Sequence, residues 1–301
     1  MDPGRTGDHA RRRTRRSYVM SVLVGVDGSD GGRAALRWAD AWAAAVGARL
    51  VAVASWQYPR TAALPGGPTL GAAGEMDEVA AEDLRSTVVD ELGEGASRVT
   101  TVVERGPAAW ALLQLATREH ASLLVVGRRG LGRLEGRLLG SVSRRVAELS
   151  PCPVAIVPTE WHGEGPIVVG VDGSPGAAHA LDWAITAAEA HGVGIVLVHG
   201  LAGVPAEVGP SAIDRFVDQA RTLVDRHAHR VSGAGVDVVK VVRVDDPRSL
   251  IPLVADQYDA SLVVVGGKGD GPVSGMLVGS VVNHIAQQSE HPVVIVPEPP
   301  R

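Results

Sequence analysis

Short runs of consecutive apolar residues alternate along the chain with longer stretches in which apolar residues recur at helical spacing. The run at 22–26 predicts a strand buried on both faces, and the spacing over 31–45 predicts the helix that follows it. The same reasoning predicts further strands at 50–54, 99–103, 123–126, 154–157, 167–171, 195–199, 236–242, 262–265 and 293–296. It predicts further helices at 75–92, 107–119, 139–150, 177–190, 213–229, 247–256 and 278–288. This alternation indicates an α/β fold with right-handed crossovers and a doubly wound parallel sheet.

The chain repeats itself. Residues 127–158 and 266–297 align without a gap over 32 positions and are identical at 15 of them. Upstream, Val-Gly-Val-Asp-Gly-Ser at 24–29 recurs at 169–174. We therefore predict two tandem domains, each with a five-stranded parallel sheet. The expected division is a leader at 1–19, a first domain at 20–160, a linker at 161–166 and a second domain at 167–298.

Composition and charge narrow the classes of function. Of the 301 residues, 45 % are hydrophobic and only 3 % aromatic, and Cys152 is the single cysteine, which excludes a disulfide within the chain. No apolar run is long enough to span a membrane, and the N-terminus lacks a signal-peptide core, so we expect a cytoplasmic protein. The net charge is −5; the leader carries six arginines against two aspartates, or +4, which leaves −9 for residues 20–301. An acidic body disfavours general polyanion binding.

The basic leader has three interpretations. It is a disordered tail, or the true start is Met20, or it is an arm that touches nucleic acid or a membrane surface.

The repeated chemistry lies after the fourth strand of each domain, in the pattern Gly-x2-Gly-x9-Gly-Ser. Glycines let backbone N–H groups approach an anion, and the free N–H groups and dipole of the following helix favour negative charge. The serine hydroxyl can add a hydrogen bond or cap that helix. Glycines that merely serve turns are the alternative, but a second copy with the same spacing favours a phosphate site. Two better-known motifs are absent: Lys268 is followed by Gly269 rather than Ser or Thr, and no Gly-x-Gly-x2-Gly follows the first strand.

On these residues the chain resembles the universal stress protein family in its tandem, ATP-binding form. The resemblance implies a Rossmann-like fold of the adenine nucleotide alpha hydrolase type and one ATP site in each domain. We expect Mg²⁺ to accompany the ATP, because this ion can bridge phosphates and nearby acids. It assigns Asp27 and Asp172 to adenine, together with backbone near Ser55 and Gly200. The complete set of implied ligand residues is Gly25, Asp27, Ser55, Gly106, Gly127, Arg128, Arg129, Gly130, Gly140, Ser141 and Val142, and then Gly170, Asp172, Gly200, Gly266, Gly267, Lys268, Gly269, Gly279, Ser280 and Val281.

The two copies differ at the expected phosphates. The first domain has Gly106-Pro107 before its third helix, whereas the second has Asp246-Pro247, and a carboxylate there repels a triphosphate unless a cation intervenes. Pro272 removes an N–H donor from the second loop. Arg128 and Arg129 accompany the first loop and only Lys268 the second, so we expect tighter binding by the first domain.

Other candidate residues are better explained structurally. His227 and His229, two apart on a helix, point to different faces and make a poor metal pair. Cys152 is expected to be a buried thiol, and Trp38 and Trp183, at equivalent places in the two domains, are expected in the core. No histidine or carboxylate is placed to activate Ser141. The last strand of each domain is apolar, and we expect the two to pair within the chain, leaving another surface for any homodimer.

These features lead to a function hypothesis with two alternatives. An ATP-binding regulator of stress or growth state, acting on an unknown protein partner with slow or no turnover, is preferred, because the loops supply donors but no catalytic base. A weak ATPase or adenylyl-transferring enzyme would need a lid, for which only residues 57–74 are long enough. A nucleotide-free interaction module is the other alternative.

Overall fold

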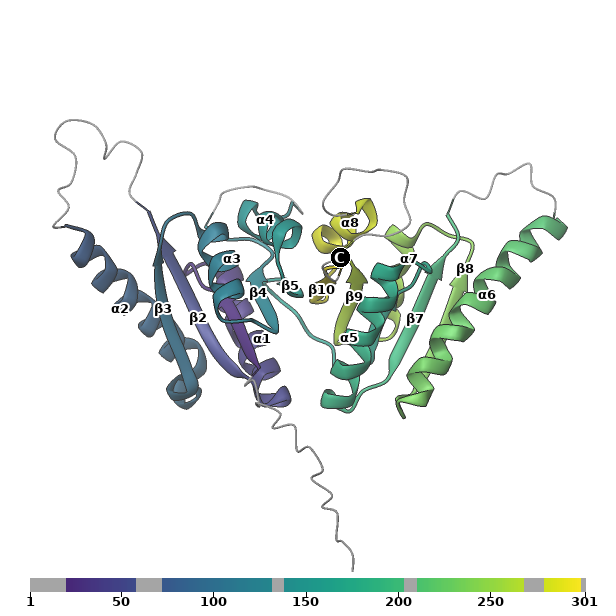
Figure 1. The fold of residues 1–301 in the computed structure, drawn as a ribbon, viewed down its shortest axis with the longest axis horizontal. Helices are drawn as coiled ribbons and strands as arrows, with labels where there is room; N and C mark the ends of the chain where they lie inside the picture. Colours follow the sequence, from purple (N-terminus) through teal and green to yellow (C-terminus); the bar gives the residue numbers. More distant parts are fainter. Residues whose placement is uncertain (1–19, 58–71, 132–137, 203–209, 268–278, 299–301) are drawn as a thin grey trace, which may run out of the picture.

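A computed structural model describes residues 20–57, 72–131, 138–202, 210–267 and 279–298. Its strands form one ten-stranded sheet in the order β3-β2-β1-β4-β5-β10-β9-β6-β7-β8 (Figure 1). The strands are β1 (Ser21–Gly25), β2 (Arg49–Trp56), β3 (Val99–Arg105), β4 (Leu123–Gly127), β5 (Val154–Val157), β6 (Ile167–Gly170), β7 (Ile195–Gly200), β8 (Val238–Arg243), β9 (Leu262–Gly266) and β10 (Val293–Val296). The predicted α/β fold with two tandem doubly wound halves is confirmed.

The helices alternate with the strands, as the apolar pattern predicts. They are α1 (Asp30–Val46), α2 (Ala72–Leu92), α3 (Ala108–Arg118), α4 (Ser141–Leu149), α5 (Pro175–His191), α6 (Pro210–Gly233), α7 (Pro247–Gln257) and α8 (Ser280–Gln288), with a 3₁₀ segment, η2 (Gly93–Arg98), after α2. Within the described parts of the chain, no helix is long and apolar enough to cross a membrane.

Two apolar layers sandwich the sheet, and each runs through both halves. In one layer, α1, α2, α5 and α6 pack against one face of the sheet, and residues such as Leu36 and Leu181 are fully buried. The other packs α3, α4, α7 and α8 on the opposite face, around Leu112 and Ile285. In Figure 1, α4 and α8 lie above the centre of the sheet and α1 and α5 lie below it. Each apolar layer is therefore continuous across the junction of the two halves.

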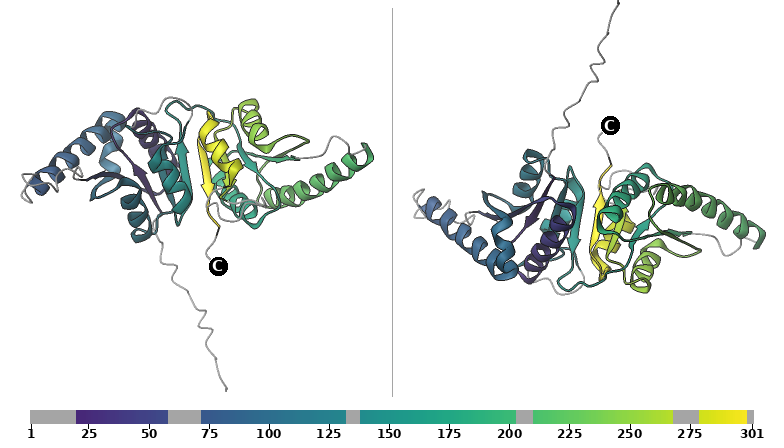
Figure 2. Two further views of the ribbon diagram at one scale, coloured as in Figure 1. Left: turned by 90° about the horizontal axis from the view of Figure 1, so that it is seen from above. Right: turned by 90° about the horizontal axis from the view of Figure 1, so that it is seen from below.

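The halves join through their last strands. Within each half the neighbouring strands are parallel, but β5 and β10 pair antiparallel, with Val294 opposite Ala155. Both residues are fully buried, and Figure 2 shows β10 (yellow) lying beside β5 at the centre of the molecule. The antiparallel junction relates the halves by an approximate twofold axis. The expected pairing of the two last strands within the chain is confirmed.

Some predicted boundaries are wrong for local reasons. The helix predicted to begin at Leu139 begins at Ser141 because Gly140, in extended conformation, is its N-cap. Pro107 is likewise the N-cap of α3 rather than part of its first turn. The strand predicted from Val236 begins at Val238, because the Val236 N–H bonds back to Val231 at the end of α6. The leader and most of the 57–74 segment lie outside the described residues, although its last three residues already belong to α2.

Candidate functional site

A cavity opens at the carboxyl ends of β1 and β4, where the strand order of the first half reverses. This is the place at which open α/β sheets bind ligands. Its volume is about 230 Å³, slightly below the range of about 300–1,000 Å³ that is usual for small-molecule sites. The lining residues are Gly25, Val26, Asp27, Gly32, Val53, Ser55, Ala108, Leu112, Val126, Gly127, Arg129, Gly130, Leu131, Leu138, Gly140, Ser141, Val142 and Ser143. Most of the positions that the resemblance assigns to the first site thus come together.

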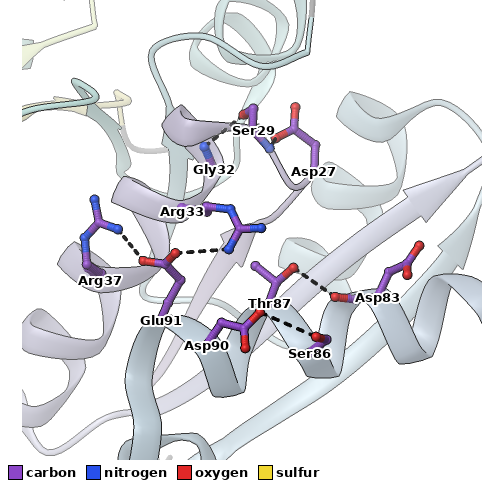
Figure 3. A network of polar contacts seen from close by, with 10 residues as sticks. All are labelled: Asp27, Ser29, Gly32, Arg33, Arg37, Asp83, Ser86, Thr87, Asp90 and Glu91. Atoms are coloured by element: carbon purple, nitrogen blue, oxygen red, sulfur yellow. Dashed lines mark hydrogen bonds and ion pairs between the residues drawn. The ribbon is translucent and has the colours of Figure 1, made fainter.

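The turn after β1 forms the floor of the cavity. Gly28 adopts a positive φ of 77°, which a side chain would strain. Asp27 Oδ1 accepts hydrogen bonds from the Ser29 N–H at 3.1 Å and from the Ser29 hydroxyl at 2.5 Å. The Ser29 hydroxyl oxygen in turn accepts the Gly32 N–H at 3.1 Å and caps α1 (Figure 3). The Asp-Gly-Ser segment is therefore a helix start as well as part of the site.

The glycine loop packs directly on this helix start. A Cβ on Gly31 would lie 2.2 Å from the Arg129 carbonyl oxygen, and one on Gly127 would lie 2.5 Å from the Gly31 backbone. A Cβ on Gly130 would lie 2.2 Å from Asp27 Oδ2, which also accepts the Leu131 N–H at 3.2 Å. The glycine spacing thus has a steric cause: the two loops are in backbone contact across the cavity.

The N-terminus of α4 is open toward the cavity. Its N-cap is Gly140, with no side-chain cap, so the first N–H groups of the helix are not satisfied by a cap. Of the two roles expected for the serine, capping is wrong, because Gly140 is the N-cap and Ser141 is already the first residue of α4; a hydrogen bond from its exposed hydroxyl to a ligand stays a prediction. Ser143 is the serine that anchors this helix, since its buried hydroxyl donates to the Gly127 carbonyl oxygen at 2.6 Å and ties α4 to the loop. The sequence pattern did not single out Ser143.

The two loop arginines diverge. Arg129 lines the cavity, and its buried Nε has no hydrogen-bond partner among the described residues. Arg128 turns away and donates from Nη1 to the Ser289 carbonyl oxygen at 2.6 Å, at the end of α8 in the other half. Of these two arginines, Arg129 is therefore the one placed to meet an anion in the cavity.

The wall of the cavity opposite the loop is apolar. Val53 and Val126 from the strands meet Leu112 of α3, whose Cδ1 would lie 3.0 Å from a Cβ on Gly25. The Val53 carbonyl oxygen accepts the Val26 N–H at 2.9 Å, and because backbone groups alternate with a period of two along a strand, those of Ser55 point the same way, beyond the end of β1. Gly106, with φ of 120°, lies nearby in the turn after β3 but is outside the lining.

The second half repeats the floor of the site. Asp172 Oδ1 accepts the Ser174 N–H at 2.9 Å, and the Ser174 hydroxyl oxygen accepts the Ala177 N–H at 3.1 Å to cap α5. A Cβ on Gly266 would lie 2.6 Å from the Gly176 backbone, and a Cβ on Gly170 2.8 Å from Ile251. Gly279 is the uncapped start of α8, followed by Ser280 and Val281, as Gly140 is of α4. Lys268, Gly269 and Pro272 lie outside the described residues.

The second half departs from the first around α7. Strand register matches Asp245 with Gly106 and Asp246 with Pro107, which shifts the expected comparison by one residue. Asp246 caps α7: Oδ1 accepts the Arg248 N–H at 2.9 Å, and hydrogen bonds from the Arg248 side chain hold the Asp246 pKa below its usual value.

Two further substitutions change the rest of the second site. Val282 stands where α4 has Ser143, and Gly267 where the first loop has Arg128. Gly200 approaches the Pro247 nitrogen closely, since a Cβ there would lie 2.9 Å away. The second half thus brings the start of α7 close to the Gly200 backbone and has two aspartates where the first half has Gly106 and Pro107.

An ion-pair cluster joins α1 to α2. Glu91 of α2 is bonded by Arg33 at 3.1 Å and by Arg37 (Figure 3). Burial raises the pKa of Glu91, but the hydrogen bonds and charges of the two arginines lower it by more, so the pKa lies below its usual value. This cluster braces the helix that carries the Asp-Gly-Ser turn.

The remaining candidates behave as structural residues. Cys152 is buried, and burial raises its thiol pKa by more than the Ser150 hydrogen bond lowers it. His227 is half-buried with a lowered pKa, caused first by burial. No group of three or more metal-ligating side chains occurs in the described ranges. Trp38 is buried as expected, whereas Trp183 is only half-buried and lies against the other half.

Fold and site together define a class: a tandem, doubly wound α/β protein with a glycine-loop crevice where the strand order reverses. The sequence profile of the universal stress protein family matches residues 19–158 and 165–297. The chain belongs to the universal stress protein family.

Relatives that match nearly the whole chain belong to the same family. A universal stress protein of Mycolicibacterium smegmatis is 32 % identical over 294 residues, covering 91 % of this chain and 96 % of that protein. One of Mycobacterium tuberculosis (strain H37Rv) is 33 % identical over 296 residues, covering 93 % and 97 %. The crystal structure of a universal stress protein from Archaeoglobus fulgidus superposes with a TM-score of 0.67 at 20 % identity, covering 92 % of this chain and 96 % of that one; it supports the fold.

Proposed function

We propose that this chain is an ATP-binding universal stress protein in which the nucleotide acts as a regulatory ligand. The observation that supports this is the cavity of the first half, which brings together an apolar wall, an uncapped helix start and Arg129 Nε, a buried nitrogen with no hydrogen-bond partner in the described part of the chain. An unpaired buried cationic nitrogen is costly, and a bound phosphate would satisfy it. The base would lie against Val53 and Leu112, near Asp27 and the Ser55 backbone, with the phosphates along the glycine loop toward the N-terminus of α4.

A bound Mg²⁺ would be held mainly by phosphate oxygens and water, as is usual for this ion. Asp27 is the only acidic residue among the described lining residues, and it lies where the base is proposed. Its Oδ2 already accepts the Leu131 N–H.

The same lining supports slow or no turnover. Phosphoryl transfer needs a base or a group that positions the attacking water. Among the described lining residues, the polar groups supply donors but no histidine, and the one carboxylate, that of Asp27, is held by the Asp-Gly-Ser turn. The proposed role is therefore to change conformation or partner choice with nucleotide, rather than to consume it.

We propose further that the first half binds ATP more tightly than the second. Asp245 and Asp246 bring negative charge to the mouth of the second crevice, although Arg248 pairs with Asp246. A triphosphate approaching that mouth is repelled, whereas the corresponding Gly106 and Pro107 of the first half are uncharged.

Calorimetric titration with ATP and Mg²⁺, after carried-over nucleotide is stripped, measures the stoichiometry. We expect one tight site, and a second site only at higher ATP concentration. Gly130→Glu removes the tight site, because even a Cβ there collides with Asp27. Gly233→Glu, at the exposed end of α6 where a Cβ meets no atom within 4 Å, is the matched control and binds as the wild type does.

The alternatives give different results. Steady phosphate release that Gly130→Glu abolishes would replace the regulatory proposal with an ATPase. The absence of both heat and carried-over nucleotide, in a protein whose circular dichroism shows it folded, would leave a nucleotide-free interaction module.

A further inference from the structure

Three indole rings form a stack across the junction of the two halves, on the face covered by α1 and α5. Trp42 lies between Trp38 of its own helix, with ring centroids 5.0 Å apart, and Trp183 of α5, at 5.4 Å. The planes of Trp42 and Trp183 are inclined by only 4°. His191 of α5 closes the edge of the stack, 4.4 Å from Trp42. The indole of Trp42 thus fills a slot between one ring from each half.

The approximate twofold axis relates the two rings that flank this slot. When the two Asp-Gly-Ser segments are superposed, Trp183 matches Trp38, and Ala187 matches Trp42. The two flanking rings are therefore symmetry mates of each other, and the slot between them can be filled from either side. At these centroid distances the slot holds one indole. Trp42 occupies it, and the symmetry-related residue is the small, buried Ala187.

We propose that the number of indoles in this slot selects the pairing partner, so that the first half pairs with a second half and not with its own kind. Two first halves, from separate chains, would bring two copies of Trp42 to a slot that holds one. Two second halves would bring only Ala187 and leave the slot empty. Overpacking and cavities both destabilise an interface. The unlike pair alone fills the slot once.

The strand pair at the junction discriminates in the same sense but more weakly. Ala155 of β5 faces the equivalent Val294 of β10, so two first halves would pair two alanines and two second halves two valines; the difference in volume is much smaller than that between tryptophan and alanine. The Arg128–Ser289 hydrogen bond has its symmetry-related place elsewhere, at Gly267 and Ser150, so two first halves would form it twice. That bond favours the pairing of two first halves, and the slot is the larger of the two features described here that oppose it.

A swap in the full chain tests the proposal. Ala187→Trp alone puts two indoles at one slot, and Trp42→Ala alone leaves it empty; each should lower the thermal midpoint and increase the fraction of chain-exchanged dimer seen by light scattering. Trp42→Ala combined with Ala187→Trp returns one indole to the slot from the opposite helix, and should recover most of the loss. Ala190→Trp, at an exposed position of α5, is the matched control and should change neither quantity.

Recovery in the double variant is the decisive result, because Trp42 also packs in the core of its own half. If Trp42 matters only there, an indole supplied from α5 cannot restore it and the two losses add. Additive losses, or an Ala187→Trp variant as stable as Ala190→Trp, would overturn the proposal.

Discussion

At the scale of single residues, neighbouring side chains of the glycine-loop motif have different roles in the site. Ser141 belongs to the repeated Gly-Ser-Val triplet but is exposed, whereas Ser143, outside the triplet, holds the glycine loop through a buried bond of 2.6 Å. Arg128 and Arg129 are adjacent, yet one reaches the other half and one lines the cavity. Local helix and loop geometry, rather than the motif, decides these roles.

Ser143→Val should destabilise the protein by about 1 kcal/mol, because the Gly127 carbonyl oxygen loses a buried hydrogen bond. Valine fits the shape, since Val282 occupies the matching position of α8. Urea denaturation measures the change, and Ser141→Ala, at the exposed start of α4, should leave the midpoint within error. An unchanged midpoint for Ser143→Val would mean that the bond does not hold the loop.

Glu91→Gln should show a pH-dependent loss of stability. The folded-state pKa of Glu91 is lowered by Arg33 and Arg37, so the carboxylate contributes stability above the unfolded-state pKa of about 4.3. This contribution is lost as the pH falls through the folded-state pKa. The variant should be less stable than the wild type at pH 7, and the gap should narrow below about pH 4. A gap that is constant from pH 7 to pH 3, measured by urea midpoints, would contradict this assignment; the exposed Glu78→Gln is the control.

The sequence pattern identified the glycines of the two loops because each occupies a backbone position that a side chain would disrupt. Gly28, Gly31 and Gly130 have no room or no conformational tolerance for a side chain, and such constraints remain visible as repeated glycines. The destination of Arg128 was not predictable, because it depends on where α8 of the other half lies.

At the scale of elements, the strands followed from continuous apolar runs, while boundaries were missed where a cap decides them. Ser29 and Ser174 show the rule, since each accepts a backbone N–H and begins its helix. Gly140 and Gly279 begin helices with no side-chain signal at all. The two kinds of helix lie at different parts of the site. The capped helices α1 and α5 follow the Asp-Gly-Ser turns, whereas α4 and α8, which have no side-chain cap, begin at the glycine loops.

Pro252→Ala should stabilise α7. Proline inside a helix removes one N–H donor and clashes with the preceding turn, at a cost of up to about 3 kcal/mol. Pro252 is the sixth residue of the eleven in α7, and Leu113 occupies the corresponding place in α3. We expect a gain of about 1–3 kcal/mol by urea denaturation. A loss of stability would indicate that the ring of this half-buried proline contributes packing that outweighs the missing bond.

At the scale of the whole molecule, the junction of the halves controls the environment of β5. Apolar last strands predicted that the halves pair, but not the stack of Trp38, Trp42 and Trp183. Trp38 and Trp42 are four residues apart in α1, so helical spacing predicts that both face the core. It does not distinguish a tryptophan that packs in its own half from one that contacts the other half.

Cys152, just before β5, should report on opening of this junction. It is 6 % exposed and its thiol pKa is raised by burial, so a thiol reagent should label it far more slowly in the native protein than in urea. Trp42→Ala should accelerate native-state labelling, and Ala190→Trp should not. Equal labelling rates in the native and unfolded protein would contradict the burial of this thiol.

The ten strands form one sheet, and the apolar layers on both of its faces continue across its centre, so the two sequence repeats are not separate bodies in the structure. Duplication supplied two copies of one architecture, and the strands of the seam between them are as deeply buried as the strands inside either copy. The sequence thus contains two repeats, whereas the folded structure packs them as one continuous body. Because β5 and β10 of the seam lie next to β4 and β9, a substitution in the seam is expected to disturb the packing beneath both glycine loops.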